Sequence, residues 1–439
     1  MYDIVLGRTR EKTEQYSTQS TILLGRQYVQ MGRTTALSNN INLDFATSHA
    51  VFVCGKRGSG KSYTLGVIAE GILEKASSVN NSISAIIFDT MGIYWTMKYP
   101  NHKDESLLNS WKLKGKPIDI TIFTPFGSFE DMKSKGVPVD KSFSLKTSDL
   151  NTDDWLLAFE LDTNSKESII ITKAINDLKK SQTNFDIDEI IKYINEMPEL
   201  DPLIKRSSIN MFENAKSWQL FTKEGFNISE LIEPGRVSVL DISAFSTYPN
   251  SWKIKNLVVG IISKRLFNER MKARKAEEIQ QVEEGVHFFS KKVASKMPLV
   301  WLILDEAHEF LPNDYKTGST DALITILREG RQPGISVVMA SQQPGKIHTD
   351  VMTQSDIILS HRLTSQIDID ALSKLMQSYL RKGLNLMIDS LPRLAGAALI
   401  IDDQNEHMYQ IQVRPRFSWH GGSAPDLTQF LKTKDEQLF

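Results

Sequence analysis

The segment at residues 55–62, GKRGSGKS, contains the residue types that bind a triphosphate. Its spacing satisfies G-x-x-x-x-G-K-[ST], in which glycines let backbone N–H groups turn inward around phosphates without a Cβ clash. We expect Lys61 to bridge the β- and γ-phosphates and the Ser62 hydroxyl to ligate Mg²⁺. The expected nucleotide-binding residues are Gly55, Gly58, Ser59, Gly60, Lys61, Ser62 and Tyr63. The apolar run before the motif and the helical pattern after it favour a site for ATP and Mg²⁺ over a plain glycine turn.

Two adjacent acids, Asp305 and Glu306, follow the apolar run LVWLIL at residues 299–304. Such a run predicts a buried strand, and carboxylates at its end can lie beside a bound triphosphate. We expect Asp305 to hold the metal and Glu306 to polarise the water that attacks the γ-phosphate. An ordinary surface strand end is the alternative, and the phosphate-binding motif upstream makes it the weaker one.

Polar groups near the next apolar run, 336–340, can sense or stabilise the γ-phosphate. Gln342 is preferred over Gln343 as the sensor because it is the first amide after the strand. A cation must also meet the charge that develops on the transferred phosphoryl group. Arg328 and Arg331 are the candidates and Arg331 is favoured, although a basic residue at a helix C-terminus can also serve the helix dipole. If Arg331 acts on a neighbour's nucleotide, function requires a ring.

Strands and helices alternate along most of the chain. Apolar runs predict strands at 49–54, 83–88, 237–242, 300–304, 336–340 and 357–360, and a hairpin of 397–401 with 409–413. Helical periodicity predicts helices at 62–75, 252–276, 318–330 and 366–382. This alternation predicts an α/β fold with a mainly parallel sheet covered on both faces.

The remaining segments differ in character from this core. Residues 1–45 alternate polar and apolar types, which predicts a short N-terminal β region with too few strands for an independent barrel. Residues 101–230 show helical spacing and predict a mostly helical insertion into a core formed by 46–100 and 231–415. Residues 416–439 are expected to be a C-terminal tail.

Two basic stretches could meet nucleic acid. The polar segment 277–297 predicts a solvated loop, with a DNA-facing or lid loop as the alternative. In that alternative Lys291, Lys292 and Lys296 would lie near phosphates and Phe288 or Phe289 near bases. The second stretch predicts either a solvated helix face or an interaction surface, and its cations are Lys253, Lys255, Lys264, Arg265, Arg270, Lys272, Arg274 and Lys275.

Composition restricts the class of protein only weakly. The chain has 439 residues, with 52 basic and 53 acidic side chains and a formal net charge of −1. This balance does not indicate DNA binding, but a ring can concentrate basic groups in its pore. Cys54 is the only cysteine, so an intrachain disulfide and a cysteine zinc site are excluded. We expect a cytoplasmic location, because no apolar run suggests a secretory signal or a membrane span.

The order of the motifs resembles the HerA group of the HerA/FtsK superfamily. The likeness spans about 45–100 and 230–415 and includes LILDEAHEFLP, LREGRQPGISVVMASQQP and IILSHRLTSQID. It implies a RecA-like P-loop ATPase core that forms a homo-oligomer, expected to be a hexamer, and pumps DNA with a nuclease or another protein effector. By motif position it implies that Arg331 is the arginine finger and Gln342 the sensor. It also implies that Arg362 lies near the nucleotide.

Two features depart from that family pattern. Family members often carry D-P-x-G-E-Y after the second core strand, whereas this chain has DTMGIY at 89–94. Ile93 replaces the acid, so we assign no catalytic role there. The N-terminal barrel of archaeal relatives is reduced here to about 45 residues.

The leading hypothesis is therefore an ATP-hydrolysing, ring-forming DNA translocase or helicase that acts with an effector. An ATP-regulated scaffold ring of a phage-defence effector complex is the main alternative. A packaging or conjugation-type motor is a third. The letters DEAH at 305–308 could suggest a superfamily 2 helicase, but no Q-x-x-G-R-x-G-R follows them.

Overall fold

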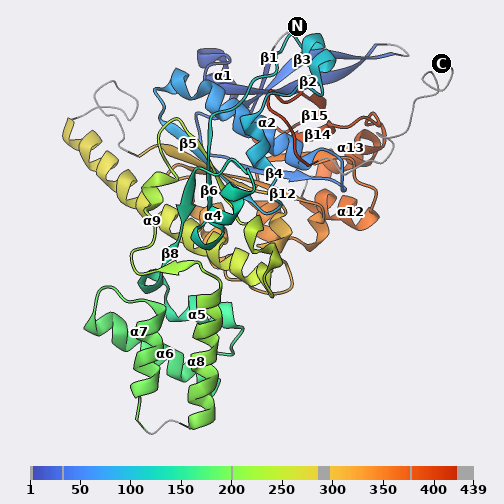
Figure 1. The fold of residues 1–439 in the computed structure, drawn as a ribbon. Helices are drawn as coiled ribbons and strands as arrows, with labels where there is room; N and C mark the ends of the chain where they lie inside the picture. The colour runs from blue at the N-terminus through green and yellow to red at the C-terminus, as the bar shows by residue number, and fades with distance from the viewer. Residues whose placement is uncertain (1–2, 32–33, 199–200, 285–296, 376–377, 423–439) are drawn as a thin grey trace, which may run out of the picture.

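The computed structural model describes residues 3–31, 34–198, 201–284, 297–375 and 378–422 (Figure 1). Within these residues the main sheet has 13 strands, in the order β1-β3-β2-β15-β14-β13-β4-β12-β11-β5-β10-β6-β7. Every adjacent pair of strands from β13 to β7 in this order is parallel. They are β13 (Ile357–His361), β4 (Ala50–Cys54), β12 (Ile335–Ser341), β11 (Leu299–Leu304), β5 (Ile83–Asp89), β10 (Val237–Asp241), β6 (Ile120–Pro125) and β7 (Lys141–Phe143).

Antiparallel pairing extends this sheet on the β13 side. β14 (Ala397–Asp402) and β15 (His407–Val413) form the expected hairpin, and β15 pairs with β2 (Thr21–Met31). β2 pairs with β3 (Thr34–Asp44), which lies parallel to β1 (Asp3–Leu6). The N-terminal strands are thus part of the main sheet. A short helix, α1 (Arg10–Tyr16), which the sequence pattern did not suggest, connects β1 to β2.

Helices cover both faces of the sheet. Successive residues of a strand point to opposite faces, and the core strands carry apolar side chains on both, so each face has to be buried. Along β11, Trp301 and Ile303 pack in the core cluster that contains residues of α2 (Lys61–Lys75). Leu302 and Leu304 pack in the other cluster, with α9 (Ser251–Glu284) and α10 (Thr320–Glu329). The near-continuous apolar runs of the core strands are therefore explained by burial on both faces.

The segment 101–230 differs from the expectation of a mostly helical insertion. It begins with α3 (Glu105–Ser110), contributes β6 and β7 to the main sheet, and carries α4 (Phe126–Ser134) beside them. The helical insertion itself comprises α5 (Thr152–Phe159), α6 (Lys166–Ser181), α7 (Ile187–Glu196) and α8 (Pro202–Ser217). A two-stranded sheet of β8 (Leu145–Lys146) and β9 (Phe221–Thr222) lies where this insertion projects from the body (Figure 1). The strong helical periodicity of the insertion masked the short apolar run ITIF of β6.

The long helix α9 corrects the expectation of a loop at 277–297. The helix continues to Glu284, so a loop was wrong for 277–284. The loop candidates Lys291, Lys292, Lys296, Phe288 and Phe289 lie outside the described residues.

The basic residues of α9 are largely used inside the molecule. Lys253 pairs with Glu160 at 2.6 Å, and Arg265 pairs with Asp149. Lys255 is buried and donates to the Thr90 carbonyl at 3.2 Å. These contacts tie α9 to the insertion and to the core, which neither of the two expected roles for the basic stretch anticipated.

Three further helices of the described chain are α11 (Thr349–Thr353), α12 (Gln366–Leu375) and α13 (Ser378–Asp389), and α12 contacts both of the others. Over the described part of the chain, no helix combines the length and apolar character needed to cross a membrane.

Candidate nucleotide site

The glycine motif forms the connection between β4 and α2. Gly55, Gly58 and Gly60 have positive φ angles of 154°, 74° and 115°. A Cβ at Gly55 would lie 2.5 Å from Ser59 Oγ and 2.6 Å from His361 Cβ, whereas one at Gly58 would meet nothing within 4 Å. The loop therefore needs glycine both for its backbone conformation and for its close packing against β13.

The loop is braced from behind by residues that the motif does not include. The Lys56 N–H donates to the Arg362 carbonyl at 3.2 Å, and His361 Nε2 lies 2.9 Å from Thr64 Oγ1 on α2. Burial lowers the pKa of His361 to about 4, so this imidazole is neutral at physiological pH. Arg362 contacts the loop through its backbone, and its side chain is not among the residues that line the cavity described below. His361 gave no signal in the sequence because its role depends on a contact 297 residues away.

Lys61 begins α2 and is almost fully buried, with 5% of its surface exposed. Its ammonium group donates to the Lys56 carbonyl at 3.2 Å. Burial lowers the pKa of Lys61, and the negative charges of Glu306 and Asp305 oppose this shift. A buried cation with one carbonyl partner is well placed to bind an anion.

Asp305 is held in place where β11 ends. Its exposed fraction is 2%, and its Oδ2 accepts a hydrogen bond from the Tyr94 hydroxyl at 3.2 Å. The same hydroxyl lies 3.4 Å from the Ser62 carbonyl, so Tyr94 connects the acid to the start of α2. Sequence reasoning missed Tyr94, although it lies next to Ile93 in the segment that departs from the family pattern.

Glu306 occupies a left-handed backbone conformation, with φ 50° and ψ 44°. Gln342 Nε2 donates to Glu306 Oε1. The other carboxylate oxygen, Oε2, is buried and has no hydrogen-bond partner among the described residues, with His308 Nδ1 at 3.5 Å. Burial raises the pKa of Glu306, and the hydrogen bond from Gln342 opposes this shift. An unsatisfied buried carboxylate oxygen at this position can accept a hydrogen bond from a water molecule.

These groups converge on one cavity of about 160 Å³. It is lined by Arg57, Gly58, Gly60, Lys61, Ser62, Tyr63, Met91, Ile93, Glu306, Gln342 and His420. Gly55, Ser59 and Asp305 are not among the lining residues. The open backbone at Gly58, the buried Lys61 and the unpaired Glu306 oxygen fit a bound nucleoside triphosphate.

The donor set also fits Mg²⁺ held jointly by protein and nucleotide. Within the described residues, no group of three or more His, Cys, Asp or Glu side chains could hold a metal on its own. Mg²⁺ is commonly bound by one or two protein groups, water and substrate phosphates. Ser62, which lines the cavity, and the buried Asp305 are the protein groups that would hold it.

Ile93 lines the cavity where many family members carry an acid. The nearby Asp89 is buried and accepts hydrogen bonds from the Gly92 and Tyr94 N–H groups at 2.7 and 2.9 Å. Burial and the neighbouring Asp241 raise the pKa of Asp89 to about 7. Asp89 therefore shapes the loop that places Tyr94, and we assign it no chemical role.

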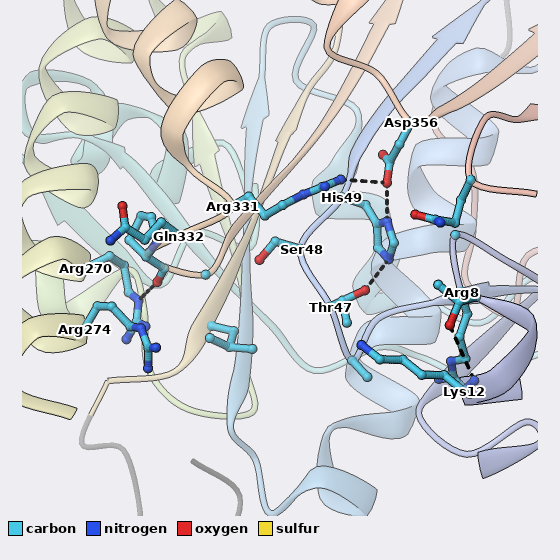
Figure 2. Close-up of a pocket in the computed structure, with 17 residues that line it drawn as sticks. Arg8, Lys12, Thr47, Ser48, His49, Arg270, Arg274, Arg331, Gln332 and Asp356 are labelled. Carbon is cyan, nitrogen blue, oxygen red and sulfur yellow. Dashed lines mark hydrogen bonds and ion pairs between the residues drawn. The ribbon is translucent and has the colours of Figure 1, made fainter. Parts of the chain in front are cut away.

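Arg331 does not reach this cavity. It precedes β12, at the amino edge of the parallel sheet, whereas the glycine loop lies at the carboxyl edge. The seven residues of β12 separate the two edges by roughly 20 Å. Figure 2 shows Arg331 beside Asp356 and His49 in a second cavity, of about 450 Å³. Its side chain is 71% exposed and its Nη2 lies 3.4 Å from Asp356 Oδ2.

Arg328 is held differently. Its guanidinium contacts Asp350 Oδ2 through Nε at 2.7 Å and Nη2 at 2.6 Å. It is thus engaged in a closer ion pair than Arg331, which favours Arg331 as the arginine available to a neighbouring molecule.

Comparison with known proteins places this site in a family context. A family model described as "Helicase HerA, central domain" matches residues 29–266, more than half of the chain. A DNA double-strand break repair helicase HerA of Sulfurisphaera tokodaii is 23% identical over 354 residues, covering 79% of this chain and 60% of that protein. The protein of the same name from Pyrococcus furiosus is 25% identical over 183 residues, covering 40% of this chain and 32% of its own length. The chain thus spans no more than about three fifths of these relatives.

Solved structures with low sequence identity share the fold. VirB4 of Thermoanaerobacter pseudethanolicus superimposes with a TM-score of 0.52 at 12% identity, covering 90% of this chain and 96% of VirB4. The plasmid coupling protein TrwB, solved with a non-hydrolysable GTP analogue, gives a TM-score of 0.50 at 12% identity and covers 96% of this chain and 98% of TrwB. These similarities confirm the expected α/β fold with a mainly parallel sheet.

Proposed function

The chain belongs to the P-loop ATPase family of the HerA helicase central domain, and from this premise we propose that it is an ATP-hydrolysing, ring-forming motor that moves DNA. The observation that carries this proposal is the position of its charged groups at the two edges of one sheet. The glycine loop, Asp305 and Glu306 lie at the carboxyl edge, and an exposed arginine lies at the amino edge.

In the proposed reaction, the glycine-loop N–H groups and Lys61 bind the phosphates of ATP. Ser62 and Asp305 would hold Mg²⁺, which when bound neutralises phosphate charge and orients the γ-phosphoryl group. Glu306 accepts a hydrogen bond from the attacking water through its unpaired Oε2, while Gln342 fixes the carboxylate through Oε1. Gln342 can therefore transmit a change at the γ-phosphate to β12.

The ring follows from the incomplete site. Charge developing on the γ-phosphoryl group needs a further cation, and Arg331 lies too far away to provide it within its own chain. In a head-to-tail ring, the amino edge of one subunit faces the carboxyl edge of the next. We propose a homohexamer in which Arg331 completes the neighbour's site.

DNA is the proposed substrate because the curated relatives are named DNA double-strand break repair helicases. Phosphate contacts in the pore of such a ring need only a few cations per subunit, which agrees with the net charge of −1. A protein effector such as a nuclease is the proposed partner.

The test combines native mass measurement with ATPase assays in the presence and absence of linear DNA. We expect ATP-dependent rings and DNA-stimulated hydrolysis, both of which Lys61→Ala should remove. Lys75→Ala, at the exposed end of the same helix, is the matched control and should resemble the unmodified protein. Hydrolysis that DNA leaves unchanged would contradict the motor and favour an ATP-regulated scaffold ring.

A further inference from the structure

A fully buried acid in the glycine-loop helix anchors the segment that was expected to begin a C-terminal tail. Glu70 on α2 has no exposed surface. Arg414 Nη1 donates to its Oε2 at 2.9 Å, and Arg416 Nε donates to its Oε1 at 3.3 Å. The N–H groups of Phe417 and Ser418 donate to the same carboxylate, each at 3.0 Å, and the Ser418 hydroxyl does so at 2.6 Å. The expectation of a tail was therefore wrong for residues 416–418.

The pairing of Glu70 is complete enough to keep it ionised. Burial would raise the pKa of Glu70, but Arg414, Arg416 and Ser418 outweigh burial and lower it. A buried carboxylate is stable only when its oxygens are paired in this way. Gly66 allows the approach of Arg416, because a Cβ there would lie 2.5 Å from the guanidinium carbon.

The opposite side of the same segment is fixed by the chain that follows β5. The N–H groups of Asn101 and Lys116 donate to the Phe417 carbonyl, both at 2.9 Å. The Trp419 N–H donates to the Tyr99 carbonyl at 2.8 Å. Residues 414–419 are thus held between α2 and the 99–116 segment, and the residue that follows them has a defined position.

That residue is His420, which lines the nucleotide cavity together with Tyr63. The two rings lie 5.3 Å apart in an edge-to-face arrangement of 76°. The Arg416 N–H donates to the Tyr63 hydroxyl at 2.6 Å, and Arg416 Nη1 lies 3.2 Å from His420 Nδ1. Arg416 therefore positions both rings while it is itself bound to Glu70.

The protonation state of His420 indicates what it can bind. Burial, with Arg416 and Lys103, lowers the pKa of His420 to about 4, so the ring is neutral at physiological pH. Arginine can only donate, so Nδ1 accepts from Arg416 and the ring proton lies on Nε2. Nε2 has no hydrogen-bond partner among the described residues. A neutral N–H donor adds no charge for the phosphates, which already meet Lys61 and the glycine loop.

We propose that His420 and Tyr63 form a wall of the nucleotide site that contacts the nucleoside part of bound ATP. His420 Nε2–H donates to an acceptor atom of the ribose or the base, and the edges of the His420 and Tyr63 rings pack against the nucleoside. Arg416 and Glu70 are positioning residues for this wall. The proposal rests on the proposed function only in requiring that the glycine-loop cavity binds ATP.

The test separates nucleoside contacts from phosphate contacts by calorimetry with two Mg²⁺-bound ligands, ATP and tripolyphosphate. All variants carry Glu306→Gln so that ATP stays intact. We expect His420→Ala to weaken ATP binding about tenfold, the loss typical of one hydrogen bond with its packing, and to leave tripolyphosphate binding within about twofold. His420→Gln, which keeps an N–H donor, should recover part of the loss. Lys61→Ala should weaken both ligands.

His407→Ala is the matched control, because this histidine is exposed on β15 and does not line the cavity. Unchanged ATP binding by His420→Ala, alongside a loss in Lys61→Ala, would overturn the wall and leave the proposed function intact. Equal weakening of ATP and tripolyphosphate would also overturn it, because His420 would then support the phosphate loop. Unchanged binding by Lys61→Ala would instead contradict the proposed function.

Discussion

The two edges of the parallel sheet hold their charged groups in contrasting ways. At the carboxyl edge, Lys61 is buried and Glu306 is half-buried, and each lacks a full set of partners. At the amino edge, His49 is buried between Asp44 and Asp356, and the series of contacts ends at the exposed Arg331 (Figure 2). The groups at the first edge lie in a cavity that can receive a ligand, and the cation at the second edge is exposed. In the proposed ring, each subunit would contribute these two edges to two different catalytic sites.

The largest effect should come from removing the exposed cation. Arg331→Ala should lower the ATPase rate of the assembled ring by about 10³-fold, the scale of an arginine finger. ATP affinity of the separate subunit should stay unchanged, because Arg331 lies at the opposite edge from its own glycine loop. Steady-state kinetics and calorimetry measure the two quantities. Loss of ATP binding by the separate Arg331→Ala subunit would show that the amino edge affects the nucleotide site of its own chain.

A smaller effect is expected at the contact between Gln342 and Glu306. Gln342→Ala removes the donor to Oε1 and lets the carboxylate move. We expect kcat to fall about tenfold, less than the roughly 10²- to 10⁴-fold that a general base itself contributes. Gln343→Ala is the control at the next position. Equal losses in the two variants would argue against a specific role for Gln342.

Removal of His49 should change stability rather than chemistry at the carboxyl edge. Burial would lower the pKa of His49, but Asp356 and Asp44 raise it to about 9 from 6.5. Because the folded-state pKa is the higher one, this stabilisation is full below pH 6.5 and is lost as pH rises through 9. The wild-type protein should therefore lose about 3 kcal/mol more stability than His49→Gln between pH 6.5 and 9.

Chemical denaturation at several pH values measures that difference. Parallel stability profiles for wild-type protein and His49→Gln would show that the ion pairs at the amino edge contribute nothing to folding. ATP affinity should be the same in both proteins.

The smallest effect is expected for Arg328→Ala. Arg328 is 57% exposed and paired with Asp350 on its own subunit, so its loss should change stability and ATPase rate by about twofold or less. The contrast with Arg331→Ala sharpens the assignment of the finger. A loss as large as that of Arg331→Ala would show that the two arginines act together.

The sequence predicted the parts of the fold that have local patterns. Val300 to Leu304 and Ile83 to Phe88 are continuous apolar runs, and both are central strands because helices cover both faces of the sheet. The glycine loop was located by its spacing, and the structure gives it the strand-to-helix context that the motif requires.

Long-range contacts account for most of what the sequence did not indicate. Tyr94 contacts Asp305, which is 211 residues away, and His361 contacts Thr64, which is 297 residues away. His420 is positioned through the contact between Tyr63 and Arg416, which are 353 residues apart. The periodicity of a sequence carries no information about such distant partners.

β6 and β7 were missed because they are short and flank a strongly periodic helical region. The helix α9 extends beyond its apolar residues, and Glu277 in this extension pairs with Arg270 at 3.2 Å.

Mixing Arg331→Ala and Glu306→Gln subunits in equal amounts shows whether a neighbouring subunit completes the nucleotide site. Each variant alone should form inactive rings. Random mixing places an intact Arg331 beside an intact Glu306 at about a quarter of the interfaces, so we expect recovery of about a quarter of the wild-type ATPase rate. A mixture no more active than its separate components would contradict a site completed by the neighbouring subunit.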